Sequence, residues 1–389
     1  AAAAICQQFK ATRIIGMLIT GIILGPYVLD LLDPSILSIS SELRQMALII
    51  ILLKAGLSLD LSDLKKVGRP AVLMSFVPAS FEILAFFLFA PHILGIKPIE
   101  AAVMGAVLAA VSPAIVVPRM VRLMDQNYGT DKSIPQLILA GASCDDIFVI
   151  VLFSTFSNMA QGGNAHLMDF VNIPVSILFG IVLGGITGYL LSLFFETAYA
   201  HKHCVRNSMK VIIVLGISFL LMAIETWMKD IVSISGLLAV VSMACLLKIK
   251  STTFVSKRLS DKFGKLWLAA EVILFVLVGA AVDIRYTLNA GGAAILMILV
   301  ALLFRSVGVA ICLIRTRLTK KERLFCILSY LPKATVQAAI GSVPLAMGLP
   351  CGQIVLSVAV LGILITAPLG AILIDGTYKK LLCQSKNKK

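Results

Sequence analysis

Two adjacent aspartates, Asp145 and Asp146, stand inside a long apolar stretch of this sequence. Neighbouring carboxylates in an apolar environment repel each other and are poorly solvated unless a cation or a proton compensates them. Adjacent helical residues point about 100° apart, so one carboxylate can face a cavity while the other faces protein. Such a group can bind a hard cation or take up a proton, and alternation between the two gives coupled exchange. The alternative is a structural pair held by a buried Arg or Lys.

Five more charged residues stand within apolar stretches: Lys54, Glu82, Glu271, Arg305 and Lys333. Charges at membrane depth are costly, so each is a candidate functional residue. Lys54 is close enough to the aqueous side for its ammonium to snorkel to the membrane surface, so a lysine without a transport role is the favoured interpretation. Glu271 is either an interfacial charge or an acid in the funnel through which ions enter.

Arg305 stays charged at any accessible pH, so it can neutralise a carboxylate but cannot carry a transported proton. We expect it to pair with Glu82 inside the helix bundle, although Asp145 is an alternative partner. Lys333 stands beside a break in its helix and either offsets the negative ends of helix dipoles or snorkels to the surface.

Two apolar stretches carry breaks where a spanning helix should be smooth, at 112–118 and at 331–335 with Pro344. Proline frees a backbone carbonyl, which is tolerated at membrane depth where the freed group lines a cavity or finds a polar partner. The two breaks occupy corresponding positions in two halves of opposite orientation, 70–160 and 293–374. This arrangement is typical of the inverted repeats of transporters.

Composition sets the class of protein that carries these residues: 59% of the 389 residues are hydrophobic, 14% are charged, and the mean hydropathy is +1.00. These values indicate an all-α polytopic membrane protein rather than a soluble or nucleic-acid-binding one. Twelve stretches have the length and apolarity of spanning helices, at 11–29, 43–60, 70–94, 99–118, 134–160, 173–196, 210–226, 231–248, 267–284, 293–314, 322–347 and 352–374. The repeated glycines Gly21/Gly25 and Gly180/Gly184/Gly188 give small-residue faces typical of helix packing.

The Lys and Arg residues test this segmentation, because 27 of the 34 fall in connections on one side and four on the other. The positive-inside rule then places the C-terminus in the cytoplasm. The opening residues read as the end of something longer, so we expect a further helix before the first stretch. The eight cysteines show no metal-binding or disulfide pattern, and no cofactor is expected.

The chain resembles the cation/proton antiporter superfamily, and within it the NHA-type sodium/proton exchangers. The resemblance is carried by five stretches that span nearly the whole chain, at 16–26, 54–60, 111–118, 141–146 and 332–338. It implies an inverted-repeat antiporter fold with two crossed broken helices. It also implies a homodimer with a dimerisation panel (1–69 and 197–292), an ion-transport core (70–160 and 293–374), a linker helix (161–196) and a cytoplasmic basic tail (375–389).

The resemblance also implies roles for single residues. Asp146 is the ion and proton carrier and Asp145 its partner, so the two would hold the monovalent cation. Oxygens of Ser112, Val111 and Ala142 would help to coordinate the cation, and Arg305 would be the basic residue that compensates charge. The sequence departs from electrogenic bacterial members, which carry Lys at position 305, and from electroneutral ones, which carry Asn at 145.

The leading functional hypothesis is exchange of Na⁺ or Li⁺ for H⁺ across a cell membrane by alternating access, without enzymatic activity. A K⁺/H⁺ exchanger is the near alternative, because ion choice depends on cavity size and ligand number. A cation channel is the alternative from another class, although no selectivity motif such as TVGYG is present. The expected partners are a monovalent cation, protons, the lipid bilayer and a second copy of the chain.

Overall fold

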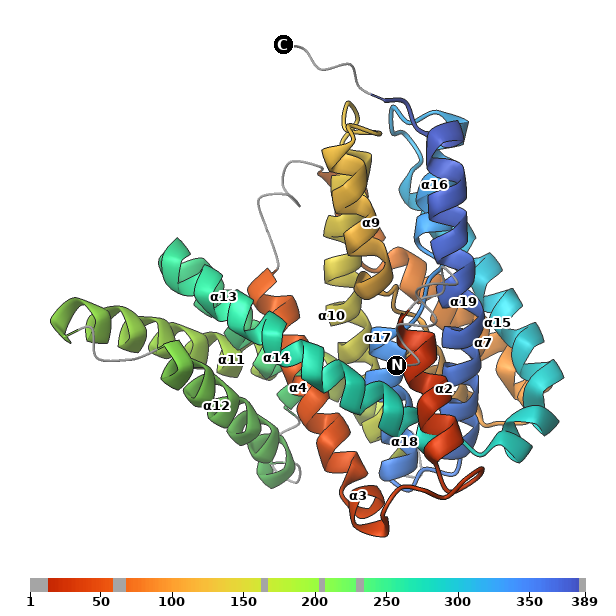
Figure 1. The fold of residues 1–389 in the computed structure, drawn as a ribbon, viewed down its shortest axis with the longest axis horizontal. Helices are drawn as coiled ribbons and strands as arrows, with labels where there is room; N and C mark the ends of the chain where they lie inside the picture. The colour runs from red at the N-terminus through yellow and green to blue at the C-terminus, as the bar shows by residue number, and fades with distance from the viewer. Residues whose placement is uncertain (1–12, 59–67, 162–166, 203–206, 229–233, 385–389) are drawn as a thin grey trace. The chain divides into compact units, whose positions relative to one another are not determined.

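The computed structural model describes residues 13–58, 68–161, 167–202, 207–228 and 234–384 (Figure 1). Within these residues the structure is helical, apart from turns and one isolated bridge between Tyr128 and Gln384. The chain forms two compact units, Ala1–Ser41 with Asp60–Val149 and Phe275–Lys389, and Glu42–Leu59 with Ile150–Leu274. Helices α4, α10 and α14 run from one unit into the other.

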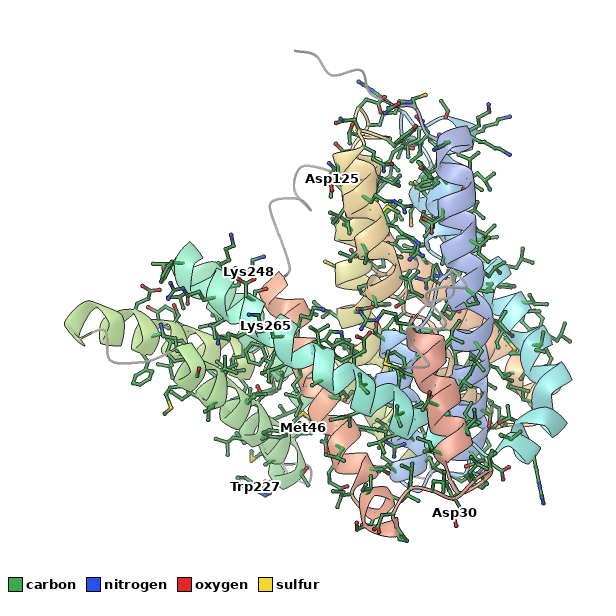
Figure 2. All side chains as sticks on the ribbon, in the orientation of Figure 1. Asp30, Met46, Asp125, Trp227, Lys248 and Lys265 are labelled. Atoms are coloured by element: carbon green, nitrogen blue, oxygen red, sulfur yellow. The ribbon has the colours of Figure 1, made fainter. Side chains whose placement is uncertain are left out.

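The first unit holds both broken helices of the predicted repeat. Its complete helices are α2 (Arg13–Leu24), α3 (Pro34–Ser38), α6 (Arg69–Met74), α7 (Val77–Leu94), α8 (Pro98–Leu108), α9 (Pro113–Asp125), α15 (Ile284–Cys312), α16 (Lys320–Ser329), α17 (Thr335–Gly341), α18 (Val343–Ala346) and α19 (Gly352–Leu381). It also holds the first half of α10 (Ile134–Gln161) and the end of α14 (Thr253–Ala280). Figure 2 shows Asp30 and Asp125 at opposite ends of this unit, as expected for connections on alternate sides of a bundle.

The second unit is built from long apolar helices. It holds most of α4 (Ser40–Ser58), the second half of α10, α11 (Leu167–Lys202), α12 (Asn207–Met228), α13 (Gly236–Lys250) and the start of α14. The glycines of α11 pack on the backbone of α13, because a Cβ on Gly184 would come within 2.1 Å of the Ala239 carbonyl oxygen. In the first unit Gly21 of α2 meets the Val276 carbonyl of α14 equally closely. The predicted small-residue faces are therefore used for packing within the chain.

Each of the twelve predicted stretches contains helix. In the part of the chain that the structure describes, eight helical segments are long and apolar enough to cross a membrane, and two shorter apolar helices join them (Arg13–Leu24 and Thr335–Ala346). The helix expected upstream falls on residues before 13, which lie outside the described residues. The predicted division into panel, core and linker stays a prediction, because compactness alone does not show which parts move.

Several predicted boundaries were wrong, among them the start of α15, which lies at Ile284 rather than at 293. Helix α14 begins at Thr253 rather than near 267, because Val255, Leu259 and Phe263 recur every four residues and are buried while charged residues occupy the other face. Helix α9 extends past Pro118 to Asp125, and α19 extends past 374 to Leu381. Near the end of α9 and the end of α19 the two helices are joined by ion pairs from Asp375 to Arg119 (3.1 Å) and Arg122 (2.5 Å).

Candidate functional site

The two interrupted helices meet and cross inside the first unit, as the resemblance to antiporters implied. Helix α8 ends at Leu108 and α9 begins at Pro113, while α16 ends at Ser329 and α17 begins at Thr335. The Ser112 amide donates a 2.8 Å hydrogen bond to the Pro332 carbonyl, which joins one interruption to the other. Gly370 of α19 permits this approach, because a Cβ there would come within 2.2 Å of the Pro332 ring.

The end of α8 leaves carbonyls without helical partners, and these receive side-chain donors from the opposite half of the repeat. The ammonium of Lys333 donates to the Leu108 carbonyl (2.5 Å), and the Gln337 amide donates to the Ala110 carbonyl (2.7 Å). Arg305 donates to the carbonyl between them, that of Ala109. Two cations therefore lie at the negative end of the α8 dipole, as predicted for Lys333.

Arg305 on α15 makes both of the ion pairs that the sequence left as alternatives. Its Nη1 lies 3.0 Å from Glu82 Oε2 and its Nη2 lies 2.9 Å from Asp145 Oδ2. Its Nε donates to the Tyr330 carbonyl at 2.6 Å. The side chain is fully buried, so these two carboxylates and the backbone carbonyls are what make a charge tolerable here.

Lys333 forms a second ion pair with Glu82. Its Nζ lies 2.6 Å from Oε1 and 2.8 Å from Oε2 of that carboxylate, and the residue is 1% exposed. The snorkelling interpretation of Lys333 is therefore wrong. The backbone is fixed as well, because the Lys333 amide donates to the Thr366 hydroxyl of α19 (3.0 Å).

The two aspartates of α10 have different surroundings. Asp145 Oδ2 accepts from Arg305 and from the Val111 amide (2.9 Å). Asp146 is 6% exposed, and among the described residues it takes part in no ion pair, and its Oδ1 has no hydrogen-bond donor. Asp145 is thus held by the protein, while Asp146 is buried with its charge uncompensated.

Two buried hydroxyls lie at the starts of the second half-helices of the two breaks. Ser112 precedes α9, Thr335 begins α17, and neither hydroxyl oxygen has a hydrogen-bond partner among the described residues. Ser112 was predicted from the sequence as a site residue, but Thr335 was not, although Thr335 lies in the 332–338 stretch that carries part of the family resemblance. The structure gives least support to Ala142, which lies inside the continuous α10 helix, where its carbonyl is the acceptor for the Asp146 amide.

Glu271 and Lys54 belong to the second unit rather than to this site. Glu271 is half-buried on α14, and the Lys54 ammonium of α4 lies 5.7 Å from the centre of the Trp267 ring. The Glu271 charge also attracts Lys54. The role of Glu271 as a funnel acid stays a prediction.

A third interruption, between α6 and α7, was not predicted. Pro78 has no amide hydrogen, so it leaves the Met74 carbonyl without its helical donor. The hydroxyl of Tyr330, from the α16–α17 interruption, donates to that carbonyl at 3.4 Å. Tyr330 is the main residue of this region that sequence reasoning missed, because an aromatic in an apolar stretch gives no signal of a polar role.

Comparisons with known proteins agree with this architecture. The family model described as "Sodium/hydrogen exchanger, transmembrane" matches residues 1–379. Human sodium/hydrogen exchanger 9B2 is 33% identical over 352 residues, which cover 88% of this chain and 64% of that protein. Human sodium/hydrogen exchanger 9B1 is 31% identical over 360 residues, which cover 88% of this chain and 67% of that protein.

The solved structure of the sodium proton antiporter MjNhaP1 from Methanocaldococcus jannaschii has a similar fold. It superposes with a TM-score of 0.81 at 23% identity and covers 98% of this chain and 95% of that one. The protein is thus a multi-pass membrane protein with an antiporter fold, and its relatives are ion exchangers rather than enzymes. The chain spans just under two thirds of the length of the exchanger 9B2 relatives that it matches. By family model, sequence identity and fold, the chain belongs to the sodium/hydrogen exchanger transmembrane family.

Proposed function

We propose that this protein exchanges Na⁺ or Li⁺ for H⁺ across a membrane, with Asp146 as the group that binds cation and proton in turn. The observation that supports the proposal is a difference in ion pairing among five buried charged residues. Asp145, Glu82, Arg305 and Lys333 form one ion-pair network, whereas Asp146 has no ion-pair partner among the described residues. A buried, unpaired carboxylate is unstable unless a proton or a cation neutralises it.

The same charges suggest the stoichiometry. In the network two carboxylates oppose two cations, so it carries no net charge when all four groups are ionised. Ionised Asp146 adds one negative charge, which one proton or one monovalent cation balances. Because Arg305 cannot deprotonate and holds Asp145 as a carboxylate, one proton leaves for each cation that enters and the cycle is electroneutral.

Oxygen atoms near the crossing supply candidate ligands for the cation. Hard cations prefer oxygen. Asp146, Asp145 and Ser112 each offer a buried side-chain oxygen that lacks a donor among the described residues. The Val111 carbonyl completes the proposed set, and the Ala142 carbonyl is left out because it accepts a helical hydrogen bond within α10.

The remaining parts of the proposal concern transport as a whole. Movement of the core against the panel would expose Asp146 alternately to the two sides of a cell membrane. The chain would act as a homodimer with its C-terminus in the cytoplasm. Both statements rest on the family likeness and on the distribution of Lys and Arg in the sequence.

Replacement of Asp146 tests the proposal. In sealed proteoliposomes that contain a pH-sensitive dye, the wild-type chain should move protons when Na⁺ or Li⁺ is added outside, and D146N should move none. D125N is the matched control, because it makes the same chemical change at an exposed position near the end of α9. D146N should also keep its melting temperature, since it strands no partner charge. Proton movement by D146N at the wild-type rate contradicts the assignment of the carrier.

The same vesicles distinguish the alternatives. A response to K⁺ that exceeds the responses to Na⁺ and Li⁺ indicates a K⁺/H⁺ exchanger, and cation flux without proton movement indicates a channel. Sustained current on a solid-supported membrane under a Na⁺ gradient contradicts the electroneutral cycle.

A further inference from the structure

We propose that Tyr330 is a positioning residue for coupling, whose ring holds Arg305 against Asp145 so that Asp146 alone exchanges its proton. The inference rests on the proposed function and names a residue that fixes its stoichiometry. Tyr330 immediately follows α16, in the interruption before α17, and is completely buried.

Tyr330 contacts Arg305 in two ways. Its backbone carbonyl, freed by the end of α16, accepts from Arg305 Nε at 2.6 Å. Its ring also faces the guanidinium, with 5.3 Å between Arg305 Cζ and the ring centre. A cation over an aromatic face at this distance is attracted to it. The carbonyl fixes Nε, and the ring limits where the rest of the guanidinium can lie.

The far end of Tyr330 is held by two other helices. Its hydroxyl donates to the Met74 carbonyl where α6 gives way to α7 (3.4 Å). It also lies against Gly141 of α10, where an added Cβ would come within 2.1 Å of the hydroxyl oxygen. Gly141 stands one helical turn before Asp145 and therefore on the same face of α10. Tyr330 thus sits between the helix that carries Arg305 and the helix that carries Asp145.

Loss of the ring frees the guanidinium on the side of Asp145. Arg305 keeps other acceptors, in Glu82 and the Ala109 and Tyr330 carbonyls, so it can move away from Asp145 and remain paired. Asp145 then loses part of its compensation and takes up a proton as well. Two protons rather than one would leave for each cation, and the cycle would carry charge.

Three variants separate the ring from the hydroxyl. Y330L removes the ring, Y330F removes only the hydroxyl, and F325L is the matched control. Phe325 is also fully buried on α16 in the same apolar cluster, but in the described part of the chain its ring makes no cation–π contact. Coupling is measured in proteoliposomes as the effect of an imposed membrane potential on the Na⁺ gradient that just balances a fixed pH gradient.

The wild-type chain, Y330F and F325L should show a balance point independent of voltage. Y330L should show a balance point that shifts with voltage, and the decrease in log KM for Na⁺ per pH unit should steepen from about one toward about two. If Y330L and F325L share one voltage response, Tyr330 has no coupling role, whatever the wild-type stoichiometry. A voltage-dependent wild-type chain contradicts the proposed electroneutral cycle instead, so the two failures are distinguishable.

Gly141 provides a second test that does not depend on how well Y330L folds. G141A places a Cβ against the Tyr330 hydroxyl, which should displace the ring and produce the coupling change. The double variant Y330F/G141A removes the clashing oxygen and leaves Met74 Cβ at 3.0 Å and Tyr330 Cζ at 3.3 Å as the nearest atoms, which need only a small shift, so voltage independence should return. A coupling change that is the same in G141A and Y330F/G141A overturns the inference, since the defect then does not pass through Tyr330.

Discussion

The crossing in the first unit and the α11–α13 contact in the second unit join helices in opposite ways. Between α11 and α13 the contact needs no charge, because Gly180, Gly184 and Gly188 bring the two backbones together. At the crossing, helices are interrupted and the freed carbonyls are satisfied by Lys333, Arg305 and Gln337. Close packing stabilises the α11–α13 contact, whereas neutralisation of buried charges and carbonyls stabilises the crossing.

This difference determines what each region can do. A contact between glycines and a backbone favours one packing arrangement of the two helices. It contains no group that takes up or releases a proton or a cation. The charged network is complete in itself but leaves Asp146 beside it without a partner, so the site changes state whenever a proton or cation arrives or leaves. A transport site is therefore expected in the region whose stability depends on the balance of buried charges.

The largest expected effect comes from breaking the network at its centre. R305A leaves Asp145 as a buried carboxylate without an ion-pair partner and removes one of the two cations at Glu82, so it should destabilise the fold by roughly 3–5 kcal/mol. E82Q should cost less, because Arg305 keeps Asp145 as a partner, although Lys333 loses its carboxylate. Thermal melts in detergent should give a double variant that is less destabilised than the sum of the single variants. Additive losses would show that Glu82 and Arg305 act independently.

A smaller effect is expected at the contact between α11 and α13. G184A places a Cβ 2.1 Å from the Ala239 carbonyl and should destabilise the fold by about 1–3 kcal/mol by forcing the helices apart. G185A on the same helix is the control, because nothing lies within 4 Å of its Cβ position, and its melting temperature should be unchanged or slightly raised. Sodium-dependent proton transport should retain the wild-type coupling ratio in both variants. Equal losses of stability would mean that Gly184 does not pack as the structure indicates.

Sequence reasoning reached the features that break a rule of membrane helices. Charged residues in apolar stretches, prolines inside spanning helices and repeated glycines each conflict with a smooth lipid-facing helix, so each could be recognised without a structure. The pairing of Glu82 with Arg305 followed from placing the two halves in opposite orientation. These features were enough to predict two broken helices in opposite halves, whereas the crossing of the two was implied by the resemblance to antiporters.

What sequence reasoning missed depends on contacts between distant segments. Tyr330 is an ordinary aromatic until Met74, Gly141 and Arg305 surround it. The Lys333 side chain could equally have reached the surface, since it points inward because Glu82 and the Leu108 carbonyl lie within reach of its ammonium. The start of α14 was missed because its buried face recurs every four residues among lysines, and a search for continuous apolarity passes over that pattern.

The smallest expected effect concerns an ion pair at the edge of the first unit. Unlike the buried ion pairs at the crossing, this pair is partly exposed to solvent. Lys132, just before α10, lies 2.9 Å from Glu322 at the start of α16. The hydrogen bond to Glu322 raises the pKa of Lys132 above its ordinary value of 10.5, and the nearby charges of Glu322 and Asp131 add to this effect. The Lys132 side chain is 30% exposed, so solvent screens the pair.

K132Q should therefore lower stability by less than about 1 kcal/mol, well below the cost of R305A. Glu322 also keeps its bond from the Thr319 amide (2.6 Å), so it is not stranded. Because the folded-state pKa of Lys132 is raised, its contribution is fully present below 10.5 and disappears only as the pH rises through the higher folded value. Melting curves of K132Q and the wild-type chain should differ by a constant amount between neutral and mildly alkaline pH and converge only in strong alkali. A difference that is already lost at mildly alkaline pH would mean that the fold does not raise the pKa of Lys132.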